Sequence, residues 1–184
     1  MKLQDFYKDL KFTNLRLIED GNLAITTKIL VCTPSKKALD VLLERLLTNK
    51  EICTLLEKGL FKMLRLGSEE KTSAIAKRIH LHTFTANAMF ASGGVDQKSA
   101  QNTQAKNRLA SCNILFSTLN SLTNSRISRS SIFDLCIVDE SSQCTEPELL
   151  LPIGLLNCRK VFFCGDHYQL PGTILANINR QNGF

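Results

Sequence analysis

The chain has 184 residues, of which 43% are hydrophobic and 22% are charged, enough for one ordinary globular core. Only nine Gly and four Pro are present, which excludes a collagenous or disordered chain. The net charge of +6 favours an anionic partner such as nucleic acid only slightly, because many unrelated domains are equally basic.

The cysteines and the apolar runs indicate an intracellular protein without a membrane anchor. Seven Cys are present and none forms a Cys-x-x-Cys pair, which favours a reduced protein over a disulfide framework. No apolar run approaches the roughly 20 residues that span a bilayer. His80 and His82 form an isolated His-x-His, which a structural pair explains better than a metal site.

Short apolar runs along the chain are typical of strands covered on both faces of a parallel sheet. They lie at residues 28–32, 113–116, 133–138 and 160–164, with a weaker candidate at residues 61–66. Helical patterns separate these runs. The alternation predicts an α/β fold with a doubly wound, mostly parallel sheet.

Two helices are predicted from their starting residues. Ser35 is a good N-cap for a helix whose leucines recur at helical spacing. Thr145 and Glu148 match a capping box for a second helix, which Pro152 would kink. Between residues 68 and 110 the pattern weakens. Residues 92–94 and the polar stretch 96–107 are interpreted as a loop or as part of a small inserted subdomain.

The strongest chemical signal is a pair of carboxylates, Asp139 and Glu140, directly after an apolar strand. In a phosphoryl-transfer site the first can hold Mg²⁺, usually through water, and the second can accept a proton from the attacking water. The alternative is a strand that ends in two solvated acids.

A second polar turn follows the next predicted strand. Gly165 permits a tight turn, and Asp166 and Gln169 supply an acceptor and an amide that can contact a γ-phosphate or its attacking water. The alternative is a simple Gly-Asp turn closed by Pro171. Ligands of open α/β sheets bind beyond the carboxyl ends of the strands, so we expect both signals at one rim.

Four segments together resemble superfamily 1 helicases, in the order that this family shows. Asp139-Glu-Ser-Ser-Gln143 resembles the DExxQ form of the Walker B motif, and Gly165-Asp-His-Tyr-Gln-Leu-Pro171 resembles the GDxxQLP motif. Leu30-Val-Cys-Thr-Pro-Ser-Lys-Lys-Ala-Leu-Asp40 is similar to motif Ia, and Ile114-Leu-Phe-Ser-Thr-Leu-Asn-Ser121 to the STLxxS segment. The sequence Glu146-Pro-Glu148 after the DExxQ motif places the resemblance in the up-frameshift and senataxin branch.

This resemblance implies a RecA-like P-loop NTPase domain that uses ATP and Mg²⁺ and moves 5′ to 3′ on single-stranded RNA or DNA. It implies a catalytic site made of Glu140, Asp139 and Gln169. Within that site Glu140 is the general base and Asp139 holds the metal. The nucleotide-binding residues it implies are Asp139, Gln143, Gly165, Asp166 and Gln169. The residues it places along the nucleic-acid groove are Thr33, Pro34, Ser35, Lys36, Ser117 and Thr118.

The sequence also departs from the family. No GxxxxGK[ST] phosphate loop occurs in residues 3–21, and Lys36 stands where Asn is usual. We expect an atypical segment over residues 1–27 and a partial first motor domain over residues 28–184, without the second RecA-like domain and inactive alone. The chain is either a piece of a working helicase or a degenerate paralogue that binds nucleic acid without catalysis. The resemblance to senataxin favours the nucleus.

Overall fold

The computed structural model describes residues 15–17, 23–25, 27–70, 72–83, 97–123, 132–156, 158–166 and 168. Its centre is a five-stranded, all-parallel sheet with the strand order β4-β5-β3-β6-β7. The strands are β3 (Ile29–Thr33), β4 (Met63–Arg65), β5 (Ile114–Thr118), β6 (Leu135–Val138) and β7 (Val161–Phe163). Each apolar run that was expected to form a strand does so, which confirms the α/β fold.

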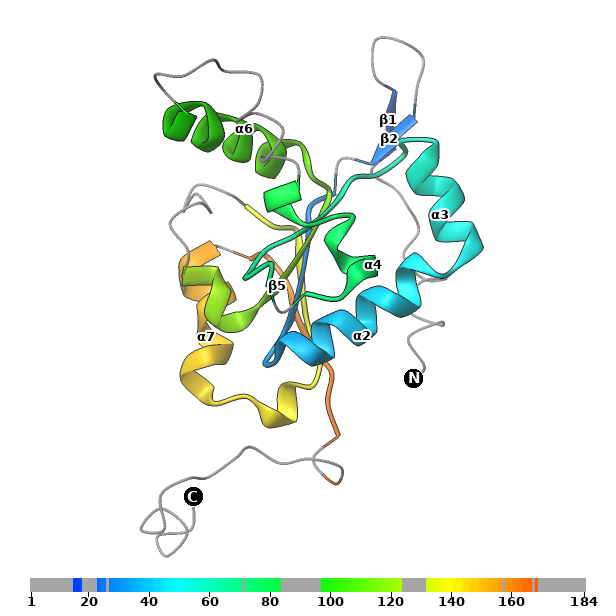
Figure 1. Cartoon of the computed structure of the whole chain (residues 1–184). Coiled ribbons are helices and arrows are strands. Elements are labelled where there is room, and N and C mark those ends of the chain that lie inside the picture. The colour runs from blue at the N-terminus through cyan, green and yellow to red at the C-terminus, as the bar shows by residue number, and fades with distance from the viewer. Residues whose placement is uncertain are drawn as a thin grey trace, which may run out of the picture.

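Helices cover both faces of this sheet (Figure 1). The helices α2 (Lys36–Leu47), α3 (Lys50–Glu57) and α4 (Ala74–Lys77) lie on one side, and α6 (Gln97–Ser111) and α7 (Glu146–Leu156) lie on the other. Two short 3₁₀ helices, η1 (Leu119–Thr123) and η2 (Ser141–Gln143), follow β5 and β6 directly.

The alternation of side chains along β3 divides the core into two clusters. Leu30 and Cys32 pack into the cluster on the side of α6 and α7, whereas Val31 packs with Leu39 and Leu43 of α2. Successive strand residues point to opposite faces, so a run that is apolar throughout is buried on both. This explains why continuous apolar runs, rather than alternating ones, predicted these strands.

The predicted helix starts are confirmed by their hydrogen bonds. The Ser35 hydroxyl accepts the amide of Ala38 at the start of α2. At the start of α7, the carboxylate of Glu148 accepts the backbone amide of Thr145 at 2.9 Å and its hydroxyl at 3.0 Å. Pro152 lies inside α7 and is buried.

The loop interpretation of residues 96–107 is wrong for residues 97–107, because these belong to helix α6. Most residues of α6 are polar, so the sequence has no apolar stripe that would predict this helix. Ala105 and Leu109 nevertheless pack on the core, and residue types such as Gln, Lys and Ala favour helix. Residues 92–94 lie outside the described residues, and the inserted subdomain remains a prediction.

The N-terminal region contributes a small antiparallel pair, β1 (Leu15–Leu17) with β2 (Leu23–Ile25). Most of residues 1–27 lie outside the described part of the chain. None of the described helices combines the length and apolarity needed to cross a membrane.

Candidate functional site

All five parallel strands end at the same rim of the sheet, and β3, β6 and β7 are neighbours there. Asp139 follows β6, Thr33 ends β3, and Cys164 follows β7. This rim is where open α/β sheets bind their ligands. Asp139 and Thr33 therefore lie at the ends of neighbouring strands on this rim.

Asp139 and Glu140 form the turn that leaves β6. The amide of Asp139 donates to the carbonyl of Cys32 at 2.8 Å, which extends the pairing of β6 with β3 by one step. Glu140 has φ 55° and ψ 36°, in the left-handed region, and its amide donates to Asp139 Oδ1 at 3.1 Å. Among the described residues it is the only non-glycine with positive φ. Such a conformation costs about 1–3 kcal/mol and is frequent at functional sites.

The side chain of Glu140 is held by a residue one turn further on. Gln143 donates from Nε2 to Glu140 Oε2 at 3.0 Å, and both residues are half-buried. An amide donor at one carboxylate oxygen fixes the direction of the group. The arrangement therefore orients a carboxylate at the rim.

Gly165 allows the end of β7 to approach this turn closely. The amide of Ser141 donates to the carbonyl of Cys164 at 2.7 Å. A Cβ at position 165 would lie 2.7 Å from the Ser142 nitrogen and 3.0 Å from the Ser141 nitrogen. No side chain fits there, so glycine is required for the β6 and β7 turns to meet.

The Cys164 thiol lies close to the Asp139 carboxylate at this rim. Burial raises the pKa of the Cys164 thiol, and the nearby Asp139 carboxylate raises it further. Both effects disfavour a thiolate. Asp139 thus contributes negative charge directly beside the end of β7.

Asp166 is turned toward its own loop. It is exposed, and its Oδ1 accepts the amide of Tyr168 at 2.9 Å. Gln169 lies outside the described residues. The structure thus brings Asp139, Glu140, Gln143 and Gly165 together, while the placement of Asp166 and Gln169 against a nucleotide stays a prediction.

The residues expected to contact nucleic acid lie at the ends of β3 and β5. Thr33 and Thr118 are partners in the parallel register of these strands. Pro34, Ser35 and the half-buried Lys36 lead from β3 into α2. Ser117 is fully buried and donates its hydroxyl to the carbonyl of Thr118 at 3.0 Å, so that side chain faces the interior.

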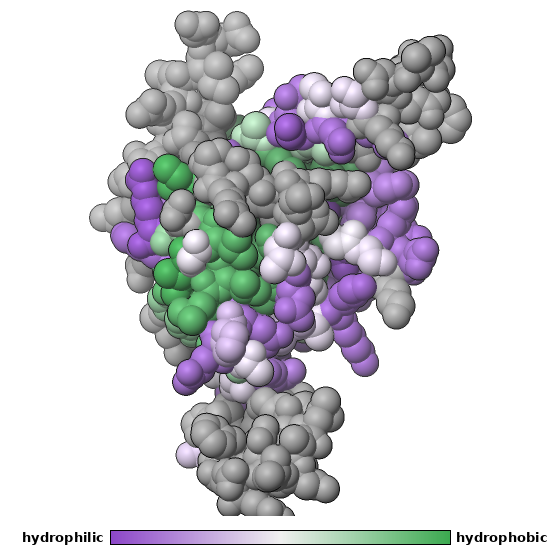
Figure 2. Space-filling view, turned by 90° about the vertical axis from the view of Figure 1, so that its left-hand side faces the viewer, coloured by the Kyte–Doolittle hydropathy of each residue, from purple (hydrophilic) through white to green (hydrophobic). Residues whose placement is uncertain are grey.

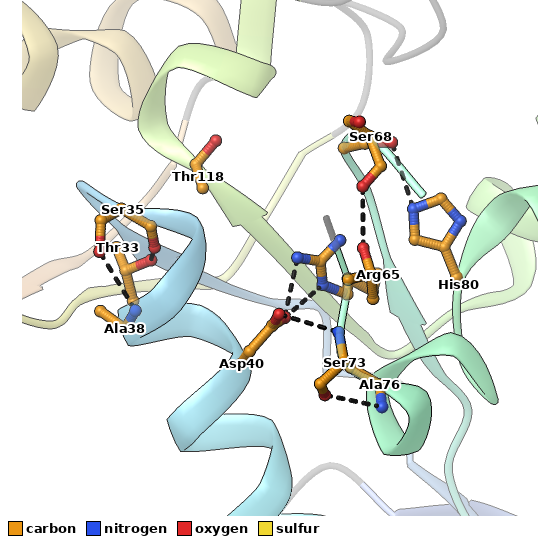
Figure 3. A network of polar contacts seen from close by, with 12 residues as sticks. Thr33, Ser35, Ala38, Asp40, Arg65, Ser68, Ser73, Ala76, His80 and Thr118 are labelled. Carbon is orange, nitrogen blue, oxygen red and sulfur yellow. Dashed lines mark hydrogen bonds and ion pairs between the residues drawn. The ribbon is translucent and has the colours of Figure 1, made fainter. Parts of the chain in front are cut away.

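Sequence reasoning missed Arg65, a charged residue that is only 1% exposed. It ends β4, and its Nη2 and Nε donate to Asp40 Oδ1 of α2 at 2.8 and 3.1 Å (Figure 3). Asp40 Oδ2 also accepts the amide of Ser73, which starts α4. The available signal was Arg65, one of two basic residues in the apolar run 61–66, together with the acid at the end of the motif Ia segment.

A family model described as "AAA domain" matches residues 12–106 and 89–177. These ranges cover most of the chain and contain each rim segment described above. The chain belongs to this AAA-domain family of superfamily 1 helicases. The matched ranges overlap between residues 89 and 106, around the start of α6.

Curated helicases of this kind align with the chain over much of its length. The chain is 28% identical over 165 residues to the probable helicase MAGATAMA 3 of Arabidopsis thaliana, an alignment that covers 85% of the chain and 19% of that protein. It is 28% identical over 166 residues to a regulator of nonsense transcripts 1 homolog of Neurospora crassa, covering 82% of the chain and 14% of the relative.

Shorter alignments reach higher identity. The chain is 50% identical over 53 residues to a 5′-3′ DNA helicase of Mus musculus, covering 28% of the chain and 3% of that protein. The chain therefore spans less than a fifth of the length of these helicases.

The donor set at the rim fits Mg²⁺, the metal that the resemblance implies. Mg²⁺ prefers oxygen ligands and is commonly held by one or two carboxylates together with phosphate oxygens and water. Asp139 offers such a carboxylate at the rim. Within the described ranges, no group of three or more His, Cys, Asp or Glu side chains is placed to hold a metal ion.

Proposed function

We propose that this chain is part of the first motor domain of an ATP-dependent helicase. Nucleotide would bind over the ends of β6 and β7, and single-stranded RNA or DNA over the ends of β3 and β5. The observation that carries the proposal is the left-handed Glu140, whose carboxylate Gln143 orients beside Asp139. The membership of the chain in a superfamily 1 helicase family supports it.

In this proposal each rim residue has a separate chemical role. Asp139 holds Mg²⁺, which neutralises charge on the phosphates when bound. Glu140 accepts a proton from the attacking water, a contribution of about 10²–10⁴-fold in rate for a well-placed base. Gln143, Gly165, Asp166 and Gln169 contact the nucleotide or its γ-phosphate.

We further propose that the chain hydrolyses ATP negligibly by itself. Residues 3–21 contain no GxxxxGK[ST] loop, whose backbone amides and lysine would bind the phosphates. We place translocation in the 5′ to 3′ direction and the protein inside the cell, with the nucleus favoured.

A test of the nucleotide site uses a fluorescent ATP analogue, with and without Mg²⁺, on the full chain. We expect weak binding that requires Mg²⁺, that Asp139→Asn abolishes, and that Glu140→Gln retains because Glu140 acts on water. Glu57→Gln, an exposed acid at the end of α3, is the matched control. Binding that is equal in EDTA, or unchanged by Asp139→Asn, would remove Asp139 from its assigned role.

A second candidate function is a nucleic-acid-binding module without catalysis, favoured by the charge of +6 and the absent phosphate loop. It predicts salt-sensitive binding of single-stranded oligonucleotides, because phosphate contacts release counterions. It also predicts no Mg²⁺-dependent nucleotide binding. Measuring both ligands on the same preparation separates the two functions.

A further inference from the structure

The helix α3 does not pack closely on the sheet. None of its residues is fully buried, and Leu55 is 38% exposed. The helix ends at Gly59, which has φ 68° and donates its amide to the carbonyl of Leu56 at 3.0 Å. A Cβ at Gly59 would have no neighbouring atom within 4 Å. The chain between α3 and β4 therefore runs past open space.

This space is part of a cavity of about 440 Å³ at the end of the molecule where the strands begin. Figure 1 shows α3 and α6 at this end, away from the turns that leave β6 and β7. Residues of α3, of the start of β4, of the segment after α4 and of the end of α6 line the cavity. Most of its lining is apolar and includes Leu56, Phe61, Met63, Leu64, Ile79 and Cys112.

The inner wall of the cavity belongs to the hydrophobic core. Met63 and Ile79 are part of the cluster that packs on α2, whereas Leu64 and Cys112 are part of the cluster on the side of α6 and α7. The cavity thus reaches both clusters around the start of β4. Small-molecule sites are typically concave, about 300–1,000 Å³ in volume and mostly apolar with a few polar groups. This cavity has each of these properties.

The charged residues that line the cavity are mainly cationic. They are Lys62, Arg78 and Arg108, against one acid, Glu57, and all four are exposed. Lys62 precedes β4, Arg78 ends α4 and Arg108 lies in the last turn of α6, so the positive charge comes from three separate elements. Long basic side chains cover apolar surface with their stems and keep their charged heads in water. An anionic group at the mouth of the cavity would therefore be attracted and a cationic one repelled.

We propose that this cavity binds a small amphipathic anion, a carboxylate that carries an apolar chain or ring. The apolar part lies against Leu56, Phe61 and Ile79, and the carboxylate lies at the mouth beside the basic side chains. Because the inner wall reaches both core clusters, the cavity encloses a ligand, which favours a small molecule over a protein segment. The site goes beyond the proposed function and does not depend on it, since the rim lies at the opposite ends of the strands.

The test is isothermal titration calorimetry of the full chain with decanoate. Decanol and decylammonium carry the same apolar chain with a neutral or a cationic head group, and butanoate carries the same head group on a short chain. We expect decanoate to bind more tightly than decanol, and decylammonium and butanoate to show no measurable binding. The order follows from an apolar cavity with a cationic mouth.

Variants of the lining locate the binding. Lys62→Gln and Arg78→Gln should each weaken decanoate binding roughly 2- to 5-fold, as expected for an ion pair near the surface. Ser111→Phe places a large side chain in the cavity at an exposed residue of its lining and should abolish binding. The matched controls are Lys58→Gln and Lys77→Gln, which remove exposed cations that are close in sequence to the lining residues. Both controls should bind decanoate as the wild type does.

Each other outcome overturns the proposal. Equal affinity for decanoate and decanol, with no change in Lys62→Gln and Arg78→Gln, would show that the basic residues play no part. Binding that survives in Ser111→Phe but is lost in Phe163→Lys would place the ligand on the apolar surface of β7. A peptide of alternating Asp and Leu that binds when decanoate does not would identify a protein-docking site instead. None of these results affects the proposed nucleotide site.

Discussion

Glu140 and Gly165 show how two single residues build one turn. Glu140 adopts a left-handed conformation, and Gly165 supplies the space in which the η2 backbone lies. The bond from Ser141 to the carbonyl of Cys164 joins the two turns. The direction of the Glu140 carboxylate depends on the backbone of the turn from Glu140 to Ser142. Gly165 therefore influences that direction through the backbone, without contacting the carboxylate.

Gly165→Ala should destabilise the protein by about 1–3 kcal/mol, since the added methyl group would meet the Ser141 and Ser142 nitrogens. Urea unfolding measures the change. Gly154→Ala is the control, because Gly154 lies in α7 with nothing within 4 Å of its Cβ position. That substitution should stabilise the protein by about 0.5–1 kcal/mol. Equal effects at both positions would show that the close approach at Gly165 is unimportant.

His80 predicts a pH dependence of stability at the residue scale. Its pKa is lowered from 6.5, so the unfolded chain binds the proton more readily than the folded protein does. The contribution is therefore fully present above pH 6.5 and is lost as the pH falls toward the lowered pKa, by at most about 1.4 kcal/mol per pH unit. Urea unfolding across this window should show a slope that His80→Gln reduces. An identical slope in that variant would exclude His80 as its source.

At the scale of elements, the Arg65–Asp40 pair joins β4, α2 and α4. The pair lies beneath the surface, with 1% of the Arg65 side chain and 13% of the Asp40 side chain exposed. Asp40 Oδ2 also accepts the backbone amide of Ser73, the residue that caps the start of α4. One carboxylate therefore fixes three elements around the end of β4.

Asp40→Ala should cost about 3–5 kcal/mol, because it leaves a buried arginine without its counter-charge. The comparison is Arg159→Ala, which breaks an exposed pair with Asp134 at 3.5 Å and should cost less than about 1 kcal/mol. Thermal unfolding of both variants gives the difference. Similar losses in the two would contradict a special role for the buried pair.

The strands and helix starts were predictable because each depends on a local pattern. Continuous apolar runs suffice for a strand buried on both faces, and Ser35, Thr145 and Glu148 each cap a helix with neighbours in sequence. Helix α6 was not predictable, since its contacts through Ala105 are made with distant strands.

Within the candidate site, Asp139, Glu140 and Gly165 were predictable from their positions at strand ends. The partnership of Arg65 with Asp40 was not, because it joins residues 25 positions apart through the packing of α2 on the sheet. The left-handed conformation of Glu140 was also not predictable, since nothing in the residues around it requires a positive φ.

At the scale of the whole molecule, the described sheet ends in an apolar edge. β7 pairs with β6 on one side, and Phe162 and Phe163 are 39% and 48% exposed. Leu150 and Ile153 of the nearly all-apolar α7 are 62% and 45% exposed. Figure 2 shows an apolar area on the side of the molecule that carries α7. An apolar edge strand of this kind invites pairing with another chain.

The chain should therefore self-associate as its concentration rises. Phe163→Lys should reduce that association, because a charge on an edge strand opposes further pairing. Light scattering coupled to size-exclusion chromatography measures the mass. Val41→Lys, at a residue of α2 that is 41% exposed, is the control and should leave the association unchanged. A monomer at all concentrations would contradict the prediction.

The bond between the Asp139 amide and the Cys32 carbonyl has a mechanical consequence for the proposed motor. Glu140 follows one partner of that bond and Thr33 follows the other. The proposed catalytic base and the proposed polynucleotide track are thus separated by a single rung of the sheet. In the proposed motor, a displacement of the β6 turn would therefore act on the end of β3 through one backbone hydrogen bond, with no helix between them.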